Sequence, residues 1–228
     1  MRFPLIATLL TALLGAAPAR AQVPPSPAEI AAYTGLHAAA ARDDVPAIAA
    51  LLRTGADANA RDEAGRTPLH VAAFGARYDA VLALVGGGAD PRAKENRRYD
   101  IVTIAAVRND TRMLRLALKL GADPRAITSP YDGTALIAAA HLGHAEIVAI
   151  LIEAGAPLDH VNNLGWTAVV EAIVLGDGGT RHLATLRALV RAGARLDIAD
   201  RDGARPLVLA QRRGFAEMVA LLESVGAR

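Results

Sequence analysis

Cysteine is absent from the 228 residues of the chain. This absence excludes a disulfide framework, a thiolate nucleophile, a cysteine-ligated zinc or iron–sulfur site and a lipidated N-terminal cysteine. Aromatic residues are also scarce, at 4% against 53% hydrophobic residues, so the core must come mainly from alanine, leucine, valine and isoleucine. That composition favours closely packed helices, and 21% charged residues argue against a disordered chain. We therefore expect a folded protein rich in helix.

Long apolar runs are missing beyond the N-terminus, because charged residues or Gly-Ala pairs interrupt every stretch. Residues 1–21 differ: a basic start precedes an apolar run over residues 3–17, and Ala19 and Ala21 occupy the small positions of a cleavage site. This pattern predicts a secretory signal peptide that is cleaved before Gln22. An uncleaved anchor is the alternative, but the run is shorter than the roughly 20 residues that span a bilayer. We expect an exported protein, periplasmic or secreted, that has no membrane association after cleavage.

Net charge is also missing once the predicted signal peptide is removed. Residues 1–21 contain two arginines and no acid, so the 25 basic residues fall to 23 and equal the 23 acidic residues. Proteins that bind nucleic acid keep a basic excess to neutralise phosphates. The charge therefore argues against DNA or RNA as a partner.

Internal repetition is the most informative feature that is present. Gly-Ala pairs recur at intervals of 33, 33, 34, 38 and 33 residues, with glycines at positions 55, 88, 121, 155, 193 and 226. A second signature begins 21 residues before five of these six glycines, and its fullest copy is Thr67-Pro-Leu-His-Val-Ala-Ala73. The fourth unit continues with Gly143-His-Ala-Glu-Ile-Val148. Six units in phase indicate a repeat architecture.

A period of 33 residues with this signature resembles the ankyrin repeat. The resemblance covers residues 34–228 and implies an all-α solenoid, in which stacked helix-turn-helix units are joined by hairpin-like loops. The repeats would start near residues 34, 67, 100, 134, 167 and 205. Residues 22–33 form a linker and a candidate capping helix, because Ser26-Pro27-Ala28-Glu29 reads as a capping box with proline in the first helical turn.

The residue pattern by itself, apart from the resemblance, predicts two helices in each unit. Threonine followed by proline at Pro68 fits the start of an inner helix, and the alanines after it permit neighbouring helices to approach closely. Turn positions follow at Asp43, Ala76, Asn109, Gly143 and Gly214, where a left-handed backbone is expected. Outer helices then carry apolar residues three and four apart, such as Leu51 and Leu151. Because one unit cannot bury its apolar face alone, the units must stack.

Two regions depart from the repeat. The third unit reads Asp100-Ile-Val-Thr103 in place of Thr-Pro-Leu-His, has Arg98 where a hairpin glycine is expected, and is followed by a loop one residue longer, residues 127–133. The fifth unit contains about five extra residues within 175–182, whose glycines predict a flexible loop. A tolerated insertion is the simpler interpretation, and a functional loop is the alternative.

The histidines offer little catalytic chemistry. His37 and His70 occupy the signature histidine, to which the resemblance assigns a structural role. His141 and His144 lie three residues apart, which suits a metal site, so a metal-dependent protein or enzyme that uses this pair and the 175–182 loop is the second hypothesis. No nucleophile-elbow, zincin or Walker sequence occurs, so we predict neither an enzyme nor a cofactor.

The hypothesis we favour is a scaffold that binds another protein on its concave face and hairpins, as the resemblance implies. Tyrosine, tryptophan and arginine are enriched at binding hot spots, and they recur just before the signature threonine and at the ends of the inner helices. The predicted contacts are Tyr33, Arg66, Phe74, Tyr99, Arg108, His141, Leu142, Trp166 and Arg212. The same loops carry Arg61, Lys94, Arg97, Arg98, Tyr131 and Leu164.

The basic residues among these imply an acidic patch on the partner, which would bind a monomer of this chain. The alternative for Trp166 and Tyr99 is that they only pack against neighbouring hairpins.

Overall fold

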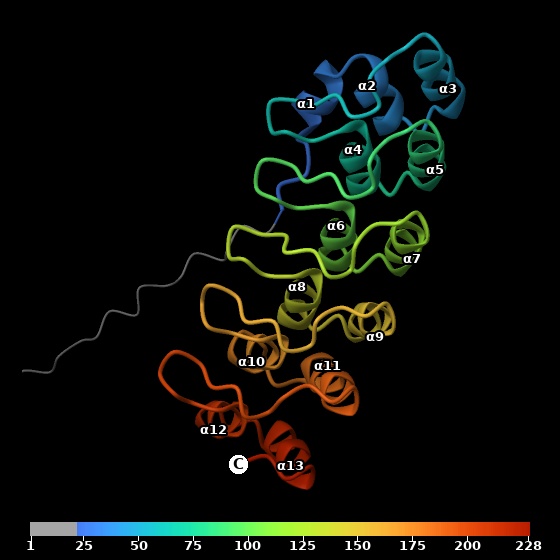
Figure 1. The fold of residues 1–228 in the computed structure, drawn as a ribbon. Coiled ribbons are helices and arrows are strands. Elements are labelled where there is room, and N and C mark those ends of the chain that lie inside the picture. Colours follow the sequence, from blue (N-terminus) through green and yellow to red (C-terminus); the bar gives the residue numbers. More distant parts are fainter. Residues whose placement is uncertain (1–21) are drawn as a thin grey trace, which may run out of the picture.

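Helices form wherever the repeat signature predicts them. Residues 22–228, which this computed structural model describes, contain thirteen α-helices and no strand. The predicted signal peptide lies outside these residues. After a short first helix, the helices alternate between an inner row and an outer row, and the two rows run side by side along the stack of repeats (Figure 1). The expected all-α solenoid is confirmed. None of the described helices is long and apolar enough to cross a membrane.

The inner row starts each repeat. Its helices are α2 (Gly35–Ala41), α4 (Pro68–Phe74), α6 (Ile101–Val107), α8 (Ala135–Leu142), α10 (Ala168–Val174) and α12 (Pro206–Arg212). Threonine caps several of them: the hydroxyls of Thr134 and Thr167 each accept a hydrogen bond from the backbone N–H three residues later, at 3.3 Å. In the third repeat Asp100 replaces threonine and accepts from the N–H of Thr103 at 2.8 Å. Each cap satisfies a backbone donor that the helix leaves unpaired.

The outer row completes each repeat. Its helices are α3 (Val45–Arg53), α5 (Tyr78–Gly86), α7 (Thr111–Lys119), α9 (Ala145–Glu153), α11 (Thr180–Arg191) and α13 (Ala216–Ser224). The turns between the two rows have positive φ at all five predicted positions: Asp43, Ala76, Asn109, Gly143 and Gly214.

The core follows the two rows from end to end. Alanines of the inner helices, such as Ala72, Ala105 and Ala139, are fully buried, which confirms that they permit close helix packing. Large side chains from both rows, such as Leu69 and Leu151, fill the space between neighbouring repeats. Each repeat therefore contributes one layer to a continuous apolar core, and its stability depends on its neighbours.

The insertion in the fifth repeat is only partly a loop. Helix α11 has twelve residues where α5 has nine, and residues 175–179 connect α10 to α11 where three residues, 75–77, connect α4 to α5. The Nε2 of His182 lies 3.0 Å from the carbonyl of His141, to which it can donate, and its Nδ1 lies 2.7 Å from Asp177 Oδ1. The expectation of a flexible glycine loop is therefore wrong in part: three inserted residues extend a helix, and side chains hold the remainder.

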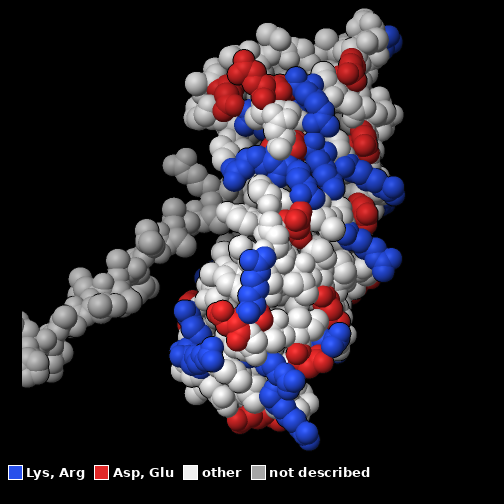
Figure 2. Space-filling model, turned by 60° about the vertical axis from the view of Figure 1, so that its left-hand side comes forward, with Lys and Arg blue, Asp and Glu red and all other residues white. Residues whose placement is uncertain are grey.

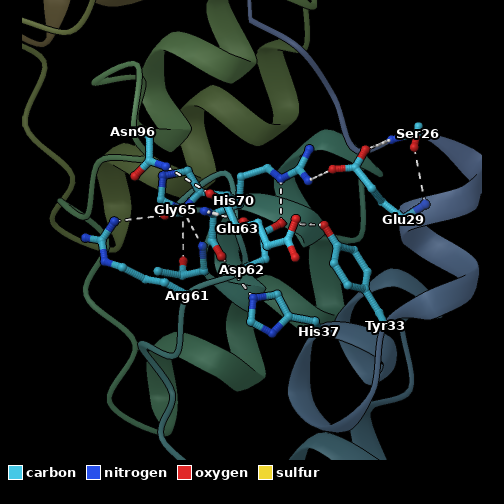
Figure 3. Close-up of polar contacts among 12 residues, drawn as sticks. Ser26, Glu29, Tyr33, His37, Arg61, Asp62, Glu63, Gly65, His70 and Asn96 are labelled. Atoms are coloured by element: carbon cyan, nitrogen blue, oxygen red, sulfur yellow. Dashed lines mark hydrogen bonds and ion pairs between the residues drawn. The ribbon is translucent and has the colours of Figure 1, made fainter.

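The first helix, α1 (Pro27–Ala32), carries the predicted capping box, in which Ser26 and Glu29 exchange hydrogen bonds. Figure 3 shows Glu29 and Tyr33 turned toward Asp62 of the next hairpin, and the Tyr33 hydroxyl donates to Asp62 at 2.7 Å. Arg66 lies between the two segments and forms ion pairs with both Glu29 and Asp62. This polar cluster joins α1 to the second repeat.

Candidate protein-binding groove

A groove of about 550 Å³ opens on the face formed by the inner helices and the hairpins. It spans α6, α8 and α10 and the hairpin loops that precede α8 and α10. Its walls are mostly apolar and include three of the chain's eight aromatic residues. The aromatic and aliphatic lining residues are Tyr99, Tyr131, Trp166, Val107, Ile137, Ala138, Leu142, Leu164 and Leu175, and the main polar ones are Thr103, Thr128, Thr134, His141, Asn162 and Glu171.

The groove lies where the sequence departs from the repeat signature. In the first two repeats the signature histidine reaches the next hairpin: His37 Nε2 lies 2.9 Å from the carbonyl of Arg66, and His70 Nε2 lies 3.2 Å from that of Tyr99. The next two repeats have Thr103 and Ile137 at that position. Threonine and isoleucine cannot make this histidine contact, and both line the groove.

Hydroxyl groups secure one wall of the groove. Thr103 Oγ1 donates to Asp100 at 2.8 Å and lies 2.5 Å from the hydroxyl of Thr128, on the longer loop. Asp100 is buried, and burial raises the pKa of its carboxyl, although the hydrogen bonds from Thr103 oppose that shift. The loop continues to Tyr131, whose ring is 38% exposed. Thus the pair of threonines holds the base of the loop while Tyr131 remains accessible.

The floor of the groove carries a buried polar cluster. Glu171 on α10 is only 4% exposed; its Oε1 accepts from the Asn162 side chain at 2.9 Å, and its Oε2 lies 3.2 Å from His141 Nδ1. Asn162 Oδ1 accepts in turn from the backbone N–H groups of Leu164 and Trp166, both at 3.0 Å. This chain of contacts positions the hairpin that carries Trp166.

Charge is distributed unevenly over the hairpins. Figure 2 shows a band of lysine and arginine side chains across the upper part of this face and a largely uncharged area below it. The hairpin at residues 57–66 contributes Arg61, and the hairpin at residues 90–99 contributes Lys94, Arg97 and Arg98, of which Arg98 forms an ion pair with Asp132. Two of these cations bind neutral carbonyls of the next hairpin: Arg61 donates to Lys94 O at 2.7 Å and Lys94 donates to Ile127 O at 2.9 Å. Their positive charge is therefore not cancelled by these contacts.

The comparisons with known proteins agree with the observed repeat fold. Family profiles described as ankyrin repeats match residues 36–85 and 102–197. A crystal structure of an ankyrin repeat domain from Acinetobacter baumannii AYE is 43% identical, with a TM-score of 0.80, and the alignment covers 85% of this chain and 98% of that one. The chain belongs to the ankyrin repeat family.

Two further relatives support the assignment. The ankyrin repeat domain of Bcl-3, a member of the IkappaB family, is 28% identical, with a TM-score of 0.78, over 86% of this chain and 88% of that domain. The protein YahD of Escherichia coli K12, named as an ankyrin repeat protein, is 36% identical over 120 residues. This match covers 52% of the present chain and 59% of YahD, so it spans little more than half of each protein.

The groove of this ankyrin repeat chain brings together four of the nine predicted contact residues: Tyr99, His141, Leu142 and Trp166. Trp166 is half-buried: it packs against the core, as the alternative interpretation expected, and it also lines the groove, where a partner could contact it. Tyr99 is only 7% exposed, and its carbonyl holds His70. Both aromatic residues therefore support the fold as well as line the groove.

Two of the predicted contacts are buried and lie outside the groove. Arg66 is 3% exposed, because its guanidinium is enclosed by ion pairs with Glu29 and Asp62. Phe74 is 7% exposed, because it packs into the core at the end of α4. Neither side chain is available to a partner without a rearrangement. The sequence spacing could not show this, because the Arg66 to Glu29 contact joins segments 37 residues apart.

The remaining predicted contacts lie outside the groove. Arg108 and Arg212 are exposed at the ends of α6 and α12. Tyr33 is half-buried, and its hydroxyl is bound to Asp62. The Ser26 N–H, followed by the Ser26 hydroxyl and Arg66, lowers the pKa of Glu29 in the same cluster to about 2. These groups stabilise the N-terminal end of the solenoid.

The residues proposed for a metal site have other partners. His141 contacts Glu171, whereas His144 Nδ1 lies 2.9 Å from the carbonyl of Ala106 in the preceding repeat. Across residues 22–228 no three histidine or acidic side chains are grouped as metal ligands. His37, His70, His144, His160 and His182 each contact a backbone carbonyl of a neighbouring repeat. The histidines thus act mainly as ties between repeats.

Glu171 and Asn162 are two buried polar residues of the groove that our sequence analysis missed. A signal for Glu171 was present, because the equivalent position of the other five repeats holds Ala38, Val71, Ile104, Ala138 and Leu209. A single carboxylate at a position that is otherwise apolar marks a site with an added role. Asn162 gave no comparable signal, since asparagine is common in turns for local reasons.

Proposed function

We propose that this protein is exported as a monomeric scaffold without catalytic activity and that it binds another protein on its inner helices and hairpins. The observation that carries the proposal is the groove, where three aromatic side chains and six aliphatic ones surround about 550 Å³. This volume lies within the range of about 300 to 1,000 Å³ that is typical of ligand sites. The groove is thus large enough for several side chains of a partner.

Residue types in the groove support a protein ligand. Tyrosine and tryptophan combine a large contact area with a polar group, and such side chains carry much of the binding energy in protein interfaces. Ankyrin repeat proteins commonly mediate protein–protein interaction and are typically non-catalytic scaffolds. The groove threonine Thr103 bonds to Asp100 and Thr128 and not to a histidine base, which favours a structural role for its hydroxyl.

The hairpin at residues 90–99, which lies beside the groove and carries four basic residues against two acidic ones, favours a partner with an acidic patch. Arg61 and Lys94 bind only neutral carbonyls in their direct hydrogen bonds, so their field extends into solvent. Such charges mainly accelerate association and act over about 8 to 10 Å at moderate salt. We therefore expect added salt to slow association more than it affects dissociation.

The test uses Tyr131→Ala in the chain spanning residues 22–228. Tyr131 is exposed, lines the groove and does not belong to the core cluster, so its truncation should leave the melting temperature nearly unchanged. Partners captured from a periplasmic extract by the unmodified chain would be identified by mass spectrometry, and their affinity for both chains would be measured. We expect binding to weaken by more than about 1 kcal/mol, roughly fivefold or more.

The matched control is Leu82→Ala, which truncates an exposed apolar side chain on outer helix α5, away from the groove. It should bind like the unmodified chain. Equal affinity of the Tyr131 variant and the Leu82 variant would show that the interface lies elsewhere.

A further inference from the structure

Glu171 occupies a buried position that costs stability unless the site uses its charge. It lies on inner helix α10 with only 4% of its surface exposed, at a repeat position that is otherwise apolar. An ionised carboxylate in such a place is expensive without a compensating charge. In the sixth repeat leucine fills the same position without this cost, at Leu209. The packing of the solenoid therefore does not require a carboxylate here.

The hydrogen bonds of Glu171 leave capacity for a ligand. A carboxylate has about four acceptor positions, and Asn162 and His141 account for two of them. Among residues 22–228, Glu171 has no ion pair with lysine or arginine, and His141 compensates its charge only when the imidazole is protonated. The side chain of His141 is itself 39% exposed, on the groove side of the cluster. A cation that enters the groove could supply the missing charge.

The walls above Glu171 suit the remainder of a long basic side chain. Lysine and arginine carry an apolar stem that packs on hydrophobic surface and a charged head that requires a counter-ion. Leu142 and Leu175 offer a hydrophobic surface along the groove on which such a stem could pack. The ring faces of tyrosine and tryptophan in the groove also attract cations. The groove crosses three consecutive inner helices, so its shape favours an extended segment over a single folded protrusion.

We propose that this groove accepts a lysine or arginine side chain from an extended segment of the partner, with Glu171 as the counter-charge. The inference rests on the proposed function, in which the groove binds a protein. Together with the basic hairpin at residues 90–99 it assigns a charge pattern to the partner: a basic side chain opposite α10 and acidic groups opposite that hairpin. That pattern specifies the direction in which the segment lies along the solenoid.

A purely structural role for Glu171 makes a different prediction. If the carboxylate served only to hold Asn162, and through it the hairpin with Trp166, then Glu171→Gln would preserve binding, because the amide oxygen still accepts from Asn162. If the charge recognises a cation, the same substitution should weaken binding while the hairpin stays in place. The two roles are thus separable with one nearly isosteric variant.

The experiment selects peptides from a random displayed library on the immobilised chain spanning residues 22–228. Synthetic copies of the selected peptides are then titrated, with fluorescence of Trp166, the only tryptophan, as the readout. We expect the selected peptides to share a lysine or arginine, and its replacement by norleucine to reduce affinity at least tenfold on the unmodified chain. On the Glu171→Gln chain the same replacement should change affinity less than twofold.

Glu146→Gln is the matched control, because it removes an exposed carboxylate on outer helix α9 and should leave both affinities as they are in the unmodified chain. Should Glu171→Gln fail to fold, the norleucine peptide alone decides the matter on the unmodified chain. Selected peptides that lack a shared basic residue, or that bind equally well with norleucine, would overturn this inference and leave the proposed function standing. Peptides that bind the Tyr131→Ala chain as well as the unmodified chain would overturn the proposed function itself.

Discussion

The stability of the solenoid should depend on pH through His70, and the size of the effect can be worked out. His70 is completely buried at the start of α4, and burial is the main cause that lowers its pKa from about 6.5 to about 4. Its Nδ1 accepts from the N–H of Thr67 at 3.2 Å, and its Nε2 faces the carbonyl of Tyr99. These contacts require a neutral ring that is protonated at Nε2. Protonation of Nδ1 would place its N–H opposite the N–H of Thr67, so that two donors would face each other.

The sign follows from which state binds more protons. Because the folded-state pKa is below the unfolded value, the unfolded chain takes up a proton first as the pH falls, and unfolding becomes easier. The part of the free energy of unfolding that depends on a neutral His70 is fully present above about pH 6.5 and is lost as the pH falls toward 4. With these two values, the free energy of unfolding should fall by about 2 kcal/mol between pH 8 and pH 5 because of His70 alone.

The assay is urea denaturation of the unmodified chain and of His70→Gln at pH 8 and pH 5. The variant lacks the titrating ring, so its loss of stability over this interval should be about 2 kcal/mol smaller, although it is less stable at pH 8. Ile104→Val serves as the control, because it removes one buried methyl group and no titratable group, and it should lower stability by a similar amount at both pH values. A His70→Gln chain with the same pH dependence as the unmodified chain would refute the reasoning.

Two further outcomes are expected. Leu151→Ala should lower the free energy of unfolding by about 2 to 5 kcal/mol, because Leu151 is fully buried between neighbouring repeats, whereas Leu51→Ala should cost less, because Leu51 is only partly buried in the first repeat; equal melting temperatures for both variants would contradict the assigned helix faces. N-terminal sequencing of protein recovered from the periplasm or the medium should begin at Gln22, and a cytoplasmic species that begins at Met1 would disprove the predicted export.

The fold could be predicted from the sequence because its signals are local and repeated six times. The threonine caps, the positive-φ turn at Asn109 and the capping box at Ser26 each depend on residues a few positions apart. Where a contact joins distant segments, the same reasoning failed. Arg66 was predicted to be a contact residue for a partner, but it is buried, because α1 packs against the hairpin at residues 57–66 and Glu29 pairs with its guanidinium.

The candidate site was only half predictable for a related reason. Residues before each threonine could be expected near the hairpin tips, and Trp166 and Tyr99 do line the groove. The groove itself arises from the side chains that are smaller or shorter than the signature histidine, Thr103 and Ile137, and its volume is a property of three repeats together. Our sequence analysis noted the third repeat only as a departure from the signature, not as the place where a cavity opens.

The insertion in the fifth repeat affects how the solenoid comes apart. A terminal repeat has a neighbour on one side only, so such stacks are expected to fray from their ends. Here the inserted segment reaches both adjoining repeats: Arg213 of the sixth repeat donates to the carbonyl of Gly176 at 2.8 Å, while His182 contacts the carbonyl of His141 in the fourth. These two contacts link the fifth repeat to both of its neighbours. We therefore expect the sixth repeat to open less readily than a terminal repeat without such a contact, and its opening to loosen the repeat that carries Glu171.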